Sequence, residues 1–272
     1  MKVLASPPLD PAIASFRTHL NYAKRMGHLL AGCEITVVPM ERLQINKAEV
    51  NRFKKLYGVT HKSIEKDMEL AREDAEFAAI AAPWFPVKCY YALYYLESIL
   101  VHLIDGTMSG FLKGGHTAIR RKMYSNLVTG SVRLTAPDLN RICMLAEVEA
   151  MPAIDSGQNA RNTFWRDDAC TNSILKKLTD YKLHDAKLGR RWNLHIRAHR
   201  DDRDEFVASE RIALLDFFYW YRIKANYRDL DYIDFENGIT ADQVLGYMEA
   251  YNAAYEGYRS LVMSKIDEVS AA

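Results

Sequence analysis

Residues 87–104 read VKCYYALYYLESILVHLI, and this stretch decides the fold. Its tyrosines and apolar residues cover nearly the whole circumference of a helix: Tyr90, Tyr91, Leu93, Tyr94, Leu96, Ile99, Leu100 and Leu103. A helix that is apolar on all sides belongs at the centre of a bundle. The tyrosines add large buried area, and their hydroxyl groups need hydrogen-bond partners. The stretch therefore predicts the central helix of an all-α bundle.

The composition agrees with a helical chain. The 272 residues include 13 glycines and 8 prolines, which are under about 5% and about 3% of the chain, whereas proteins usually contain about 7% glycine and about 5% proline. Hydrophobic residues make up 49% of the chain. These values exclude a collagen-like chain, a disordered chain and a β-sandwich with many turns. The length is sufficient for one large core or two smaller ones.

Periodic apolar residues on both sides of this stretch predict further helices. Thr240–Gln243 fits a capping box, and apolar residues then recur every three or four positions as far as Ile266. Residues 34–40 (EITVVPM) predict a short strand. The other predicted helices span residues 16–30, 64–82, 116–127, 136–150, 169–188 and 211–227, and a basic helix contains Val50 to Tyr57.

We expect three parts along the chain. Residues 1–60 form an irregular N-terminal extension, and residues 61–268 form an up-and-down helical bundle. Residues 125–210 interrupt this bundle as a helical insertion.

The charges balance overall but are unevenly placed. Lys and Arg number 36 against 35 Asp and Glu, so no global field attracts nucleic acid or an anionic membrane. Residues 182–200, however, hold six Lys and Arg against the single acid Asp185, and the acidic residues 201–205 follow directly. A basic site on this chain must therefore be local.

Several classes of protein are not indicated. The four cysteines lie far apart, the N-terminus has no long apolar segment, and residues 77–87 form the longest run without charge. That run has eleven residues, fewer than the about 20 that span a bilayer. We therefore expect a soluble, cytoplasmic protein without a disulfide framework or a membrane partner.

No motif for a cofactor or a metal is present. The chain lacks the glycine motifs of dinucleotide and P-loop sites, and it lacks the paired Glu-x-x-His of di-metal bundles. The acidic residues Asp229, Asp231, Asp234 and Glu236 could hold Mg²⁺. The neighbouring Asn237–Gly238 favours a turn-forming linker instead. We expect no cofactor and no bound metal.

The order of the motifs resembles the HEPN superfamily (higher eukaryotes and prokaryotes nucleotide-binding). The matching pieces are Cys89–Tyr94 (CYYALY), Gly114–Gly115–His116, Arg222–Tyr227 (RIKANY) and the capped helix that follows Ile239. This resemblance covers about half of the chain, residues 62–124 and 211–268. It implies a helical bundle that dimerises. Many members are metal-independent ribonucleases of phage-defence systems, or toxins paired with a nucleotidyltransferase-type antitoxin.

The catalytic motif of that family is an arginine followed shortly by a histidine. The histidine would exchange protons with the ribose hydroxyl or the leaving oxygen, and the arginine would stabilise phosphate charge. After Arg222, the positions where the histidine is expected hold Tyr227, Arg228 and Asp229. Arg190 and His195, with four residues between them, supply a second match in the basic stretch. The candidate catalytic residues are Arg190, His195 and Arg222.

The same basic stretch could bind RNA without cleaving it. Arginines would contact phosphates and Trp192 would stack on a base. The candidates are Arg191, Trp192, Arg197 and Arg200, with Arg120 and Arg121 from the helix after His116. The alternative interpretation is a solvated helix face whose arginines pair with the adjacent acidic run. We interpret His102 as a core histidine and His116 as a residue that only begins a helix.

Two functions follow. The first is an HEPN-like protein that acts on RNA or nucleotides, with RNA, a second copy and an antitoxin as partners. The second is a catalytically inactive, dimeric binding or assembly module in which Tyr251, Tyr255 and Tyr258 form the core or the interface.

Overall fold

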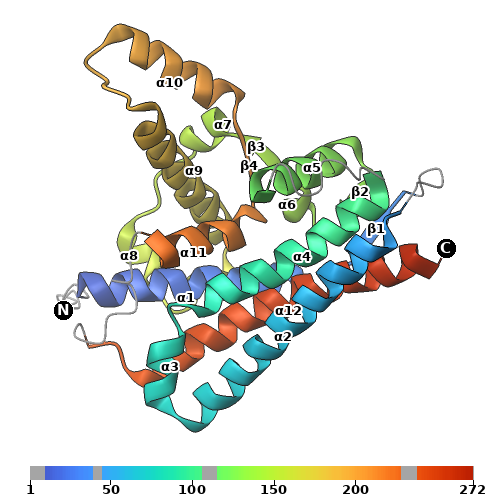
Figure 1. Ribbon diagram of the computed structural model, residues 1–272. Helices are drawn as coiled ribbons and strands as arrows, with labels where there is room; N and C mark the ends of the chain where they lie inside the picture. Colours follow the sequence, from blue (N-terminus) through green and yellow to red (C-terminus); the bar gives the residue numbers. More distant parts are fainter. Residues whose placement is uncertain (1–9, 39–44, 106–114, 228–237, 272) are drawn as a thin grey trace.

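The computed structural model describes residues 10–38, 45–105, 115–227 and 238–271 (Figure 1). The structure is about 77% helical, and its described residues form twelve α-helices and two small sheets of two strands each. The predicted all-α helical bundle is therefore confirmed.

The elements follow one another as Figure 1 labels them. The longer helices are α1 (Pro11–Leu30), α2 (Lys47–Glu73), α4 (Phe85–Asp105), α5 (Gly115–Thr129), α9 (Asp168–Arg190), α10 (Arg197–Ser209), α11 (Asp216–Tyr227) and α12 (Ala241–Ala271). The short helices are α3 (Ala75–Ala81), α6 (Pro137–Asn140), α7 (Leu145–Glu149), α8 (Ser156–Asn159) and the 3₁₀ turn η1 (Phe164–Arg166). The strands are β1 (Ile35–Val37), β2 (Val132–Leu134), β3 (Ile142–Met144) and β4 (Arg211–Ala213).

Helix α4 occupies the centre of the bundle, as its sequence predicts. The consecutive residues from Ser98 to His102 are at most 1% exposed, and consecutive residues lie on different sides of a helix. Helices α2, α11 and α12 pack against it, and α5 lies over its C-terminal half (Figure 1). Tyr90, Tyr91 and Tyr94 of α4 contact His116 of α5, and Tyr90 also contacts Tyr219 of α11, whereas Tyr95 contacts Phe53 of α2.

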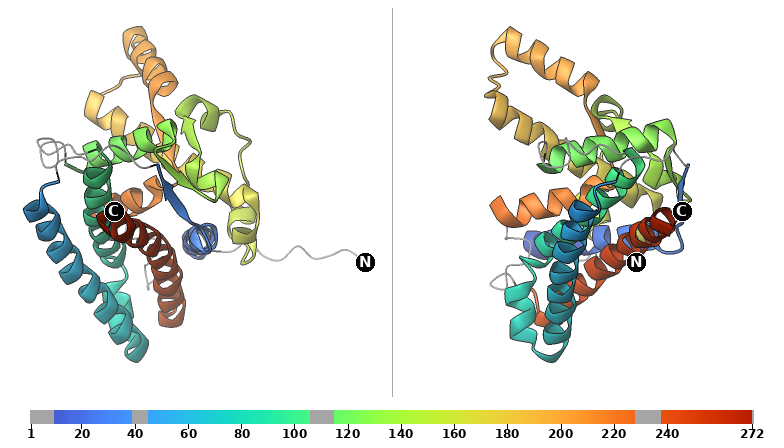
Figure 2. Two further views of the ribbon diagram at one scale, coloured as in Figure 1. Left: turned by 90° about the vertical axis from the view of Figure 1, so that its right-hand side faces the viewer. Right: turned by 45° about the vertical axis from the view of Figure 1, so that its right-hand side comes forward.

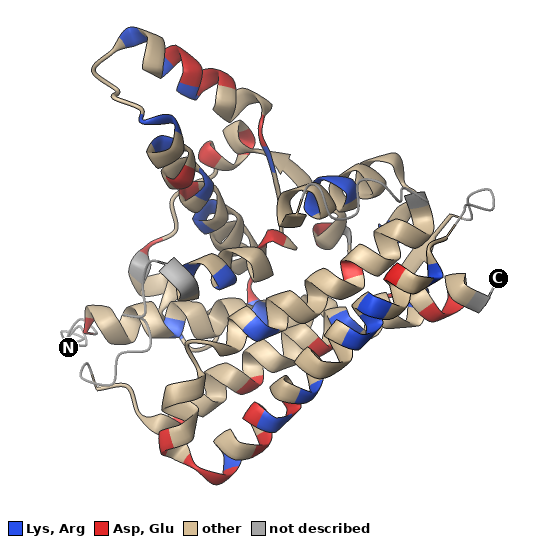
Figure 3. Cartoon of the chain, in the orientation of Figure 1, with Lys and Arg blue, Asp and Glu red and all other residues tan. Residues whose placement is uncertain are grey.

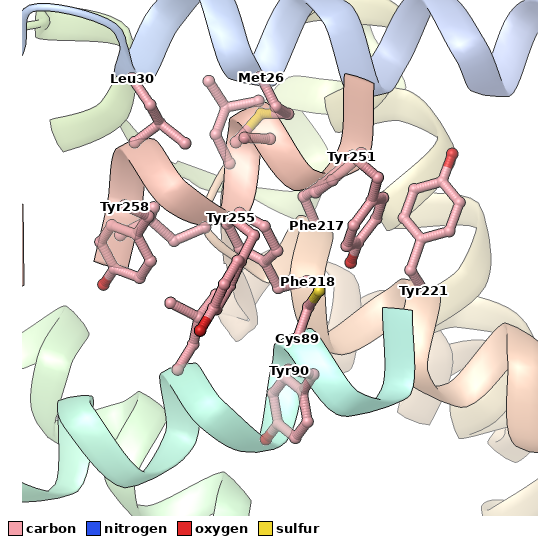
Figure 4. Close-up of a cluster of buried hydrophobic side chains, with 14 of the residues drawn as sticks. Met26, Leu30, Cys89, Tyr90, Phe217, Phe218, Tyr221, Tyr251, Tyr255 and Tyr258 are labelled. Carbon is pink, nitrogen blue, oxygen red and sulfur yellow. The ribbon is translucent and has the colours of Figure 1, made fainter. Parts of the chain in front are cut away.

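Aromatic side chains fill the space between α4, α11 and α12 (Figure 4). Phe217 of α11 stacks on Tyr251 of α12 with ring centroids 5.5 Å apart, and Phe218 stacks on Tyr258 at 5.9 Å. Tyr251, Tyr255 and Tyr258 are at most 1% exposed. These three tyrosines were expected to form either the core or an interface, and in the structure they form part of the core.

Helix α1 belongs to the core rather than to an irregular extension. Its residues Phe16, Tyr22 and Met26 are buried, and the helix runs alongside α12 (Figure 2). Glycine permits this close approach, because a Cβ atom at Gly257 of α12 would lie 3.0 Å from the Leu30 Cβ. The described part of residues 1–60 therefore differs from the expectation, since the apolar face of α1 needs α12 as a partner.

The predicted helix over residues 64–82 is divided in two. Helix α2 begins at Lys47, so it includes the predicted basic helix, and it ends at Glu73. Asp74 then adopts an extended conformation, and its carboxylate accepts the backbone N–H groups of Glu76 and Phe77. A side-chain acceptor of this kind starts a new helix, α3.

Two segments predicted as helix contain strands. Cys143 of β3 pairs with Ile212 of β4 in an antiparallel ladder, so the helices expected over 136–150 and from 211 onward are both shorter than predicted. Asp216 ends the strand, because its Oδ2 accepts the N–H of Ala213 at 3.0 Å. The strand predicted over 34–40 is β1, which pairs with β2, and its residues 39 and 40 lie outside the described ranges.

Helices α9 and α10 form an arm that projects from the bundle (Figures 1 and 2). The first half of α9 is rooted in the core, where Cys170, Ile174 and Leu175 are fully buried. From His184 to Arg190 nearly every residue of α9 is exposed. The first half of α9, which lies in the expected insertion, therefore packs in the core of the bundle, and only the tip of the arm is exposed to solvent.

Candidate functional site

The tip of the arm carries most of the candidate residues of the basic stretch. Arg190 forms an ion pair with Asp202 of α10, with 2.6 Å between Nη1 and Oδ1. Trp192 donates its Nε1–H to the other oxygen of Asp202, also at 2.6 Å, and packs against Phe206. Figure 3 shows the basic end of α9 and the acidic segment of α10 along the two sides of the arm. The basic and acidic runs therefore hold the two helices of the arm together.

Trp192 is only 6% exposed, so its ring faces α10 rather than solvent. Arg200 donates to the Leu194 carbonyl at 3.0 Å and thereby holds the turn between the helices. Arg197 lies 3.9 Å from Asp201, and it is exposed together with Arg191 and His195. In this conformation Trp192 presents no free face on which a base could stack.

Arg222 lies at a different place. It belongs to α11, and its guanidinium lies 5.4 Å from the ring centroids of both Tyr90 and Tyr91. Its Nη2 donates to the Tyr91 hydroxyl at 3.3 Å. Arg222 thus contacts tyrosines of α4, whereas Arg190 contacts Asp202 and Phe206 of α10. The structure therefore does not bring Arg190, His195 and Arg222 together.

A histidine nevertheless lies beside Arg222, and it is His116 at the start of α5. The His116 ring contacts Tyr90, Tyr91 and Tyr94 of α4, and the Tyr94 ring is the nearest at 4.2 Å between centroids. Its Nδ1 is hydrogen-bonded to the Tyr90 hydroxyl at 2.9 Å. Arg222 and His116 therefore contact the same two tyrosines, Tyr90 and Tyr91, and we call these four residues with Tyr94 the His116–Arg222 cluster.

The electrostatics of the cluster favour an uncharged imidazole. Burial lowers the pKa of His116 to about 4, and repulsion by Arg222 and Arg120 adds to this effect. Arg222 forms no ion pair with any described carboxylate, and its buried Nε–H finds no acceptor among the described residues. Among the described residues, the cluster thus combines a neutral histidine with a guanidinium that faces tyrosine rings and no carboxylate.

Arg120 connects this cluster with the interior. Its guanidinium lies 4.3 Å from the Tyr219 ring centroid and forms an ion pair with the buried Asp216. Its Nη2 also donates to the Tyr124 hydroxyl at 2.6 Å. Arg121, the next residue on α5, is exposed. Of these two predicted phosphate contacts, Arg120 is held by its own partners and Arg121 faces solvent.

The interpretation of His116 as a residue that only begins a helix missed its contacts with Tyr90 and Tyr91, the two tyrosines that Arg222 also contacts. The sequence holds a signal for them, because Tyr90, Tyr91 and Tyr94 lie on adjoining faces of one helix. Which histidine and which arginine meet these rings depends on how α5 and α11 cross α4. His102 is buried, and its Nε2 accepts the N–H of Asn46, as expected for a core histidine.

The described residues hold no cluster of three or more His, Cys, Asp or Glu side chains that could ligate a metal ion. Of the acidic linker, Asp229, Asp231, Asp234 and Glu236 lie outside the described residues, as does Arg228. No helix in the described part of the chain is long and apolar enough to cross a bilayer.

Comparison of the chain with protein-family models, with curated proteins and with solved structures finds no match.

Proposed function

We propose that this chain is an HEPN-like protein that binds RNA at the His116–Arg222 cluster and cleaves it without a metal ion. One observation carries the proposal: the imidazole of His116 and the guanidinium of Arg222 contact the same two tyrosines. A proton acceptor and a phosphate-binding cation are the two groups that such a cleavage needs. In this proposal His116 replaces the histidine that is absent after Arg222.

The state of each group supports its role. A pKa of about 4 keeps His116 neutral at pH 7, so it can accept the proton of the ribose 2′-hydroxyl. If Nδ1–H donates to the Tyr90 oxygen, Nε2 carries the lone pair that serves as the base. Arg222 has no competing carboxylate among the described residues and would pair with the phosphate.

A bound phosphate would also change the acidity of His116. Its negative charge would offset the repulsion that Arg222 and Arg120 exert on the imidazolium. The pKa of His116 would then rise toward neutrality when RNA is bound. A histidine that takes up the proton in the complex can return it to the leaving oxygen.

The experiment uses a labelled single-stranded RNA with EDTA present, and its DNA counterpart as a control without the 2′-hydroxyl. We expect cleavage of the RNA alone, and a loss of about 10²-fold or more in His116→Ala and Arg222→Ala. Binding of the RNA, measured by fluorescence anisotropy, should survive His116→Ala and weaken in Arg222→Ala. The exposed residues His184 and Arg161 provide matched controls, and His184→Ala and Arg161→Ala should cleave normally.

The proposal fails if the wild-type protein leaves RNA intact, or if His116→Ala from the same preparation cleaves as fast as the wild type. RNA binding without cleavage would retain the binding half of the proposal and refute the catalytic half.

A second candidate is the dimeric binding or assembly module without catalysis. The tip of the arm favours it, because Leu188, Leu194 and Ile196 are 57%, 42% and 47% exposed there. Exposed apolar residues that lie together often mark an interaction surface. Light scattering of the wild type and of a Leu188→Ser/Ile196→Ser variant tests this alternative, which predicts a dimer that the double substitution dissociates.

A further inference from the structure

A cavity of about 520 Å³ lies between α5, α9, β4 and α11, where the base of the arm meets the bundle. This volume is within the range of pockets that bind small molecules. It adjoins the His116–Arg222 cluster through Arg120 and Tyr219, which line it, but neither His116 nor Arg222 does so. The proposed RNA cleavage leaves this space without a role.

The interior of the cavity is apolar and aromatic. Leu178, Ile212 and Trp220 are at most 5% exposed, and the rings of Tyr181 and Tyr219 are half-buried beside them. Aromatic side chains around an apolar floor favour a flat ring as the occupant, since rings stack with offset or edge-on contacts. The floor of the cavity therefore favours an occupant that is flat and apolar.

The mouth of the cavity is charged. Within the cavity, Lys182 pairs with Glu210 at 2.7 Å, and Arg120 pairs with Asp216. Arg121 and Arg211 lie exposed at the mouth and form no ion pair with any described residue. Among the described residues, Arg121 and Arg211 thus have no carboxylate partner, while the exposed Asp185 also lines the cavity.

Four cationic side chains line the cavity against three carboxylates, those of Asp185, Glu210 and Asp216, so the lining carries a net positive charge. Burial lowers the pKa of Lys182, and repulsion from Arg120 and Arg121 lowers it further, whereas Glu210 opposes the change. An anion at the mouth would relieve this repulsion. Arginine forms paired hydrogen bonds with carboxylates and phosphates alike.

We propose that this cavity binds a small aromatic anion, with its ring against Trp220 and Tyr219 and its carboxylate or phosphate between Arg121 and Arg211. The site goes beyond the proposed RNA cleavage and does not depend on it. A free aromatic acid and an aromatic phosphate ester share the chemistry that these residues recognise.

The test titrates the full chain with 1-naphthoate, 1-naphthyl phosphate and the neutral analogue 1-naphthalenemethanol. The readout is the indole N–H signal of Trp220 in ¹H–¹⁵N spectra, identified among the four tryptophans by its loss in Trp220→Phe. We expect both anions to shift this signal, and the alcohol to bind at least about tenfold more weakly. The stronger of the two anions identifies the acid or the phosphate ester as the preferred class.

The arginines are tested separately. Arg121→Ala and Arg211→Ala should each weaken binding of the preferred anion about tenfold, and Arg161→Ala, which removes an exposed arginine elsewhere, should not. Both arginines of the mouth are exposed, so their loss leaves the core intact, and circular dichroism checks this.

Equal binding of the neutral alcohol, unchanged affinity in both arginine variants, or an unmoved Trp220 signal would overturn the proposal. Competition between a single-stranded RNA and the bound naphthyl anion would also overturn it as a separate small-molecule site. The titration does not measure RNA cleavage, so a negative titration would not contradict the proposed cleavage. In the same way, an absence of RNA cleavage would not contradict the proposed small-molecule site.

Discussion

The Tyr90 hydroxyl oxygen lies 2.9 Å from Nδ1 of His116, and this bond joins the central helix of the bundle to the first turn of α5. The bond fixes the plane of the imidazole between the rings of Tyr90, Tyr91 and Tyr94. A histidine held in this way among buried rings is disfavoured in its charged form.

The stability of the protein should therefore depend on pH through His116. Its folded pKa of about 4 lies below the ordinary 6.5, so the unfolded chain takes up the proton first as the pH falls. The stability that His116 contributes is complete above pH 6.5 and is lost as the pH falls toward 4. We expect this part to be on the order of 2 kcal/mol after allowance for partial exposure.

Urea unfolding of the wild type and of His116→Asn between pH 4 and pH 7 measures this difference. The variant should show a flatter dependence on pH over that range. An imidazole that titrates near pH 6.5 in NMR spectra would contradict the expectation.

Gly257 should not tolerate alanine. A Cβ atom there would lie 3.0 Å from the Leu30 Cβ, so α1 and α12 would have to move apart. We expect Gly257→Ala to lower the free energy of unfolding by about 1–3 kcal/mol. Gly246 on the same helix has open space around it, and Gly246→Ala should raise stability by up to about 1 kcal/mol. Denaturant unfolding of both variants checks the opposite signs.

The carboxylate of Glu97 depends on Tyr258. Burial raises the pKa of Glu97, whereas the Tyr258 O–H, which donates to Oε1 at 2.8 Å, and the charge of Arg120 lower it. Tyr258→Phe removes that donor and should cost about 1–3 kcal/mol at pH 7. The cost should shrink as the pH falls through the folded pKa of Glu97, because a protonated carboxyl needs the donor less.

Tyr95→Phe on α4 is the matched control, since its hydroxyl forms no hydrogen bond with a described residue. It should change the free energy of unfolding by less than about 0.5 kcal/mol. A Tyr258→Phe penalty that is the same at pH 4 and pH 8 would show that Glu97 is not involved.

Asp202 should hold the tip of the arm together. It accepts hydrogen bonds from both Arg190 and Trp192, so Asp202→Ala frees both residues at once. We expect trypsin to cut the turn between α9 and α10 faster in this variant, with little change in the unfolding midpoint of the bundle. Asp201→Ala, which loses only a 3.9 Å contact with Arg197, should be cut at the wild-type rate. Equal cleavage of the two variants would show that Asp202 does not hold the turn.

Much of the helical bundle could be predicted because local patterns act within one helix. The apolar circumference of residues 87–104 required neighbours on every side, and these are present in α2, α11 and α12. The capping box also formed, since Thr240 and Gln243 exchange hydrogen bonds at 2.9 and 3.3 Å. Strand pairing was harder to foresee, because β3 and β4 are short and each is stabilised by a partner about 70 residues away.

The sequence by itself determined the helical class, the central place of α4 and the residues available for chemistry. Only the tertiary structure decided which of these residues meet. Arg190 and His195 are close in sequence, but both lie at the tip of the arm, whereas Arg222 lies on α11 against the tyrosines of α4. His116 and Arg222 are 106 positions apart, and they contact the same two tyrosines because α5 and α11 both pack on the tyrosine face of α4. Spacing along a helix governs contacts within one turn, whereas the packing of whole helices governs contacts between them.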